Sequence, residues 1–123
     1  MTAATALTWL SRGQPLAASI PSNDPTRLAW VGVYPLDLTR ETTRELIRNH
    51  AQELPAPEVR VYRIRCFEVD RALIEQDTSI GESNLERKLS FFAYGEDELA
   101  KRLELLGIGL PQLAPIYQTD YPI

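Results

Sequence analysis

The chain has 123 residues, of which 44% are hydrophobic and 24% charged, as in an ordinary globular protein with a single core. Its 13 basic and 17 acidic residues give a net charge of −4, which argues against a nucleic-acid-binding protein. No stretch approaches the roughly 18 consecutive apolar residues of a membrane span. The start of the chain lacks the basic residues and long apolar block of a secretory signal, and Cys66 has no second cysteine to pair with. We therefore expect a cytoplasmic protein.

Residues 1–26 differ from the rest of the chain because they are rich in Ala, Thr, Ser and Pro. They end at Asn23-Asp24-Pro25, which is a turn or linker signal. We interpret residues 1–26 as an N-terminal arm and residues 27–123 as a single domain. Either the arm is loosely held, or its apolar residues, Trp9 and Leu10 among them, dock on this sheet or on a partner.

The first half of the domain predicts a strand, a helix and a second strand. Leu28–Tyr34 is apolar on both alternating faces, which favours a central strand. Thr39–Leu54 has an apolar stripe at helical spacing and is followed by prolines. Val59–Phe67 has apolar residues on both faces with arginines between them, so we expect an edge strand with a bulge near Val61.

The second half repeats this order after a long connection, residues 68–87, in which Asp70–Gln76 can form one or two helical turns. Leu89–Tyr94 is again apolar on both faces and predicts a strand, and Asp97–Leu106 predicts a helix. Ala114–Thr119 contains a proline, which limits it to an edge strand or an extended tail.

This order of elements, β-α-β-β-α-β, predicts an α+β domain with a ferredoxin-like antiparallel sheet and two helices on one face. Helices on one face leave the other face open. Because the central strands are apolar on both sides, we expect the second face to be covered by a partner, a second copy or the N-terminal arm, and we favour an intermolecular contact.

Few residues are candidates for chemistry. His50 is the only histidine, so sites that need two histidines are excluded. Cys66 has no base near it in the sequence, and Glu96–Glu98 are helix neighbours whose side chains point in different directions. We expect no metal and no cofactor. A pocket that joins His50 with Tyr34 or Tyr94 would instead favour an enzyme.

The sequence therefore predicts a non-catalytic protein-binding or assembly module that docks through the sheet face and the arm. Possible forms are an acidic immunity or inhibitor protein that neutralises a basic partner, a subunit of a complex, and a self-associating protein. The alternative is a small dimeric ferredoxin-like enzyme of the monooxygenase or isomerase type, with a pocket between sheet and helices. The expected partner-binding residues are Trp9, Leu10, Trp30, Tyr34, Phe92 and Tyr94.

We predict no tight binding to DNA or RNA, because a net charge of −4 with dispersed arginines gives little release of counterions. Filter binding at physiological salt measures this. Sub-micromolar affinity that falls steeply with added salt would contradict the prediction.

Overall fold

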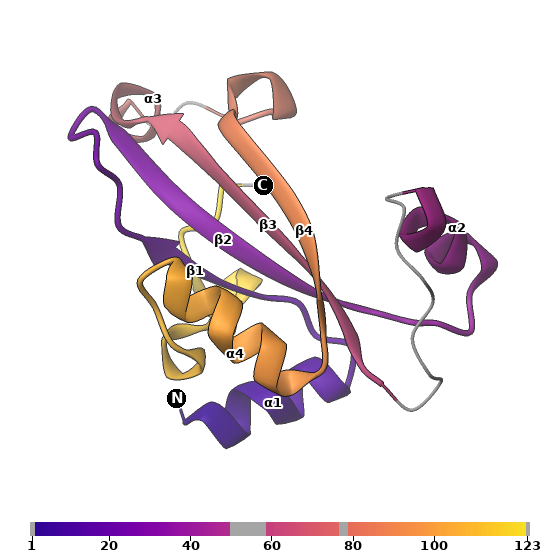
Figure 1. Ribbon diagram of the computed structural model, residues 1–123. Helices are drawn as coiled ribbons and strands as arrows, with labels where there is room; N and C mark the ends of the chain where they lie inside the picture. Colours follow the sequence, from indigo (N-terminus) through magenta and orange to yellow (C-terminus); the bar gives the residue numbers. More distant parts are fainter. Residues whose placement is uncertain (1, 50–58, 77–78, 123) are drawn as a thin grey trace.

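The computed structural model describes residues 2–49, 59–76 and 79–122 of an α+β protein with an open five-stranded antiparallel sheet (Figure 1). The strands are β1 (Leu16–Ile20), β2 (Arg27–Leu36), β3 (Val61–Asp70), β4 (Glu86–Tyr94) and β5 (Ala114–Pro115). The helices are α1 (Ala3–Ser11), α2 (Glu41–Asn49), α3 (Arg71–Glu75) and α4 (Glu96–Leu105). No helix within the described ranges has the length and apolar character needed to cross a membrane.

The strands follow the order β4-β3-β2-β1-β5, and each pairs antiparallel with its neighbours. The longest pairing joins β2 and β3, from Arg27 opposite Asp70 to Leu36 opposite Val61. The pairing of β3 with β4 shifts register between Cys66 and Glu68, whereas Val61 is in register with both of its neighbours. The bulge expected near Val61 is therefore absent. None is needed there, because both faces of β3 carry buried apolar side chains.

The ferredoxin-like strand order is not confirmed. That order needs a helix that crosses over the sheet between parallel strands, but β2 and β3 are adjacent and antiparallel. Helix α2 lies in the connection between them, past one end of the sheet (Figure 1). β3 is therefore an interior strand and β4 an edge strand, the reverse of what their sequence patterns predict.

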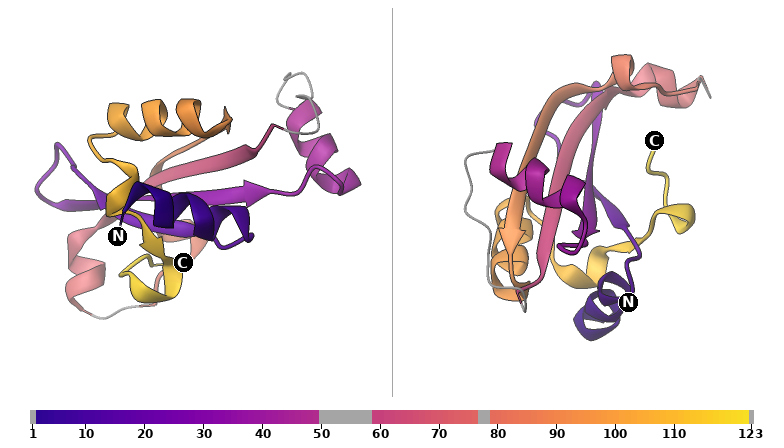
Figure 2. Two further views of the ribbon diagram at one scale, coloured as in Figure 1. Left: turned by 90° about the horizontal axis from the view of Figure 1, so that it is seen from below. Right: turned by 90° about the vertical axis from the view of Figure 1, so that its right-hand side faces the viewer.

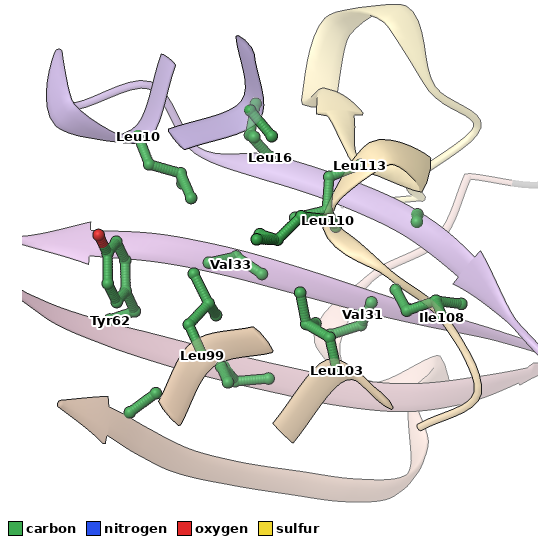
Figure 3. Close-up of a cluster of buried hydrophobic side chains, with 14 of the residues drawn as sticks. Leu10, Leu16, Val31, Val33, Tyr62, Leu99, Leu103, Ile108, Leu110 and Leu113 are labelled. Carbon is green, nitrogen blue, oxygen red and sulfur yellow. The ribbon is translucent and has the colours of Figure 1, made fainter. Parts of the chain in front are cut away.

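The first face of the sheet carries the main core. This core is covered by α1, α4 and the segment 108–113. Figure 3 shows Leu10 of α1, together with Leu99 and Leu103 of α4, pointing toward the sheet. On the sheet, the side chains of Val31 and Val33 meet them. α4 carries Leu99 and Leu103 on one side, as its helical spacing predicts, and all five of these side chains are essentially inaccessible to solvent.

The second face is covered in two places by this chain's own segments. At one end, residues 116–122, which we call the C-terminal strap, place Tyr121 beside Phe67 with ring centroids 5.3 Å apart. Phe67 in turn lies 6.1 Å from the ring of Trp30. At the other end, Ile47 of α2 packs with Val61 and Phe92. Figure 2 shows α2 and the C-terminal segment at different positions along the sheet.

The predicted arm belongs to the same folded unit. Its residues form α1 and β1, and β1 pairs with both β2 and β5. Two local expectations agree with the structure: α3 falls within Asp70–Gln76, and α4 overlaps Asp97–Leu106. The segment Ala114–Thr119 does start with an edge strand that contains Pro115, but β5 ends there and Ile116–Gln118 form a 3-10 turn. The predicted helix Thr39–Leu54 is described only as far as Asn49.

We predict that Leu103→Ala lowers the free energy of unfolding by about 2–5 kcal/mol, because it leaves a cavity beneath α4. Leu105→Ala, two residues away on the same helix, is the matched control, because that side chain is 82% exposed and its loss changes stability by less than about 0.5 kcal/mol. Urea denaturation of both variants measures the difference. Equal effects would contradict the assignment of the core face of α4.

Candidate protein-interaction surface

Between its two covered ends, the second face of the sheet carries a group of polar and basic side chains. Successive side chains of a strand point to opposite faces, so Arg63 and Arg65 share this face with Phe67. Lys88 and Ser90 of β4 lie on the same side, with Ser90 directly opposite Arg65. We call Arg63, Arg65, Lys88 and Ser90 the basic strip. A hollow of about 160 Å³, which Glu82 and Leu89 also line, lies over these residues.

The side chains of the basic strip are held by contacts with one another and with one acid. The Nε–H of Arg63 donates to the Oγ of Ser90 at 3.0 Å, so its guanidinium reaches over the edge strand. Arg65 donates to the carboxylate of Glu82 and lies over the ring of Phe67, 5.9 Å from its centroid. The Nζ of Lys88 lies 3.9 Å from the same carboxylate.

These contacts leave an excess of positive charge. The hydrogen bond from Arg65 lowers the pKa of Glu82, so this carboxyl remains charged at neutral pH. Three cations therefore share a single carboxylate. Among the residues that the structure describes, Arg63 forms no ion pair, although a guanidinium can bind a carboxylate through two parallel hydrogen bonds. The strip is locally basic within an acidic chain.

The backbone of β4 beside the strip faces outward. The N–H of Gly95 donates to the carbonyl of Arg60 at 2.7 Å, and backbone groups of an antiparallel strand alternate in direction. The register is uninterrupted from Tyr94 to Leu89, and Ser90 lies an odd number of residues before Gly95. The N–H and C=O of Ser90 therefore point away from β3. The five residues 86–90 are all exposed, and Leu89 is 55% exposed. This half of β4 is an open sheet edge.

The C-terminal strap forms one boundary of the basic strip. The hydroxyls of Tyr34 and Tyr121 lie 2.7 Å apart and hydrogen bond above Gly32. A Cβ on Gly32 would lie only 2.5 Å from the hydroxyl of Tyr121, so only glycine allows this close approach. Burial is the main cause that raises the pKa of Tyr121, and the hydrogen bond with Tyr34 raises it further. The hydroxyl of Tyr121 therefore stays protonated.

The residues expected to bind a partner are divided between the core and the surface. Leu10, Trp30 and Phe92 are buried under segments of the chain itself. Trp9 is half-buried against the main core, and Tyr94 is half-buried beside α2. Tyr34 contacts the strap. The structure does not bring these six residues together into one surface.

Two of the groups considered for catalysis, Cys66 and Tyr94, line different hollows in the described part of the chain. Burial raises the pKa of Cys66 to about 11, so its thiol is protonated and unreactive at neutral pH. His50 lies outside the described residues. Asp37 lines a hollow of about 490 Å³ beyond the end of β2, but two hydrogen bonds from Thr39 lower its pKa and make it a poor base. No group of three potential metal ligands occurs among the described residues.

Comparison with protein-family models, curated proteins and solved structures finds no match to this chain.

The sequence reasoning missed the basic strip, although a signal for it was present. Arg63 and Arg65 stand two residues apart in a strand whose other residues are mostly apolar. Two long cations on one face of a strand indicate that this part of the face meets water or an acidic group. The charged residues of this segment also fit an edge strand, which is the interpretation that the sequence pattern favours.

We predict that Gly32→Ala detaches the C-terminal strap, because the added methyl group occupies the position of the Tyr121 hydroxyl. The overpacking lowers the free energy of unfolding by about 1–3 kcal/mol. Hydrogen exchange across residues 116–122 should also become faster. Gly81→Ala is the control, because its nearest atom would be 3.8 Å away. Unchanged exchange in Gly32→Ala would contradict the role given to Gly32.

Proposed function

We propose that this chain is a non-catalytic protein-binding module that takes up an extended segment of a partner along residues 88–90 of β4. The observation that carries this proposal is the open edge at Ser90, where backbone groups and neighbouring side chains are both exposed. An added strand gains affinity from main-chain hydrogen bonds, and alternate side chains give it specificity.

This surface differs from the one that the sequence favours. Trp30 and Phe92 hold the protein's own segments in place, so they serve folding, whereas Leu89 and the basic strip remain accessible. A subunit of a complex and an inhibitor-type protein are both consistent with this use of β4. We also propose a reducing compartment such as the cytoplasm, because the one cysteine is buried and unpaired.

Site-specific photo-crosslinking in the native host tests this function. A photoreactive residue at position 89 should crosslink to a defined partner, and one at position 117 should not, although Tyr117 is more accessible than Leu89. When the photoreactive residue at position 89 is combined with Ser90→Pro, the crosslink should disappear. Proline removes an N–H that an added strand needs, whereas the pairing of β3 with β4 does not use this N–H.

Ser90→Thr is the matched control, because threonine keeps both the N–H and the hydroxyl and favours strands. The crosslink should survive in this variant. Equal crosslinking in Ser90→Pro, with an unchanged melting temperature, would show that the partner does not add a strand to β4. Absence of any crosslink at position 89 would reject β4 as the docking site.

A further inference from the structure

We infer that the segment bound along β4 is acidic, with two carboxylate side chains spaced two residues apart. This inference rests on the proposed strand addition to β4 and specifies the chemistry of the partner. It follows from where the excess positive charge of the basic strip lies relative to Ser90.

Strand geometry fixes which side chains of the added segment meet the strip. The residue that exchanges hydrogen bonds with the backbone of Ser90 places its own side chain on the same face as Ser90, with the two Cβ atoms about 5.5 Å apart. The guanidinium of Arg63 already reaches the Oγ of Ser90 at 3.0 Å. A carboxylate at this position of the segment therefore comes within reach of Arg63.

The chemistry at this position is complementary to a carboxylate. Arg63 uses its Nε–H for Ser90 and forms no ion pair within the described part of the chain, so its terminal N–H groups remain available. Ser90 accepts from Arg63 and can donate its own hydroxyl proton to the incoming oxygen. One carboxylate can thus accept from both residues.

A second acidic position of the added segment follows from the alternation of side chains along a strand, in which every second residue lies on the same face. Lys88 lies on the same face of β4 as Ser90, so the side chain two residues along the added segment lies beside Lys88. The ammonium group of Lys88 is 3.9 Å from Glu82, beyond hydrogen-bond distance, and Glu82 is already engaged by Arg65. A second acidic side chain would neutralise this remaining cation. An acid-x-acid pattern therefore fits the strip.

The experiment titrates the full chain with a capped five-residue peptide, Thr-Glu-Thr-Glu-Thr, and follows backbone amides by NMR. The amides of Lys88, Leu89 and Ser90 should shift, and Thr-Gln-Thr-Gln-Thr should bind about tenfold more weakly, because it cannot accept charge-assisted hydrogen bonds. Arg63→Gln should weaken binding of the Glu peptide by about the same factor. Arg12→Gln removes the same charge from an exposed site at the end of α1 and should leave the affinity unchanged.

The outcomes separate this inference from the function on which it rests. Equal binding of the Glu and Gln peptides at β4 would overturn the acidic partner but leave strand addition intact. Shifts outside β4, or none at all, would overturn the inference, and the crosslinking experiment would then decide the proposed function separately. Tighter binding of a single-stranded oligonucleotide to the strip, or sedimentation of the protein alone as a dimer held through β4, would also overturn it.

Discussion

The structure depends on the pairing of β2 with β3, which runs through ten residues on each strand and places apolar side chains on both faces. A sheet of this kind needs cover on both sides, because each large apolar side chain left in water forgoes roughly 1.5–3 kcal/mol. α1, α4 and the segment 108–113 close one face. The other is closed at its two ends, by the C-terminal strap and by α2.

The cover on the second face stops where the side chains change from apolar to charged. Tyr121 and Ile47 mark the two limits, and the basic strip lies between them. To bury Arg63 and Arg65 under the chain, the fold would have to remove two guanidinium groups from water, which is unfavourable without a full set of partners. The two arginines therefore explain why this part of the sheet is left uncovered. It lies next to residues 86–90 of β4, which are all exposed.

The sequence pattern predicts the local elements well, because the repeat of apolar residues is a local property. It finds the strands that become β2, β3 and β4 and the helix α4. The strand order depends on contacts between distant residues that no local repeat encodes. β4 resembles a central strand in sequence because Phe92 is buried by α2, a contact from another part of the chain. The sequence pattern does not predict β1, because Ala17-Ala18-Ser19 has a weak strand signal, although β1 lies between β2 and β5.

Charged side chains at an open sheet edge ordinarily prevent unwanted pairing between molecules, because two copies bring like charges together. Arg87 and Lys88 meet that need on β4, and the positive φ of Arg87 further distorts the beginning of the strand. The same charges that repel a second copy of this edge attract an extended segment that carries acids at alternate positions. The net charge of −4 does not decide this contact, because charges beyond the Debye length of about 8 Å are largely screened at physiological salt. In the proposed complex, the local excess of cations governs recognition at Ser90. A single substitution at Arg63 removes the cation that forms no ion pair within the described chain.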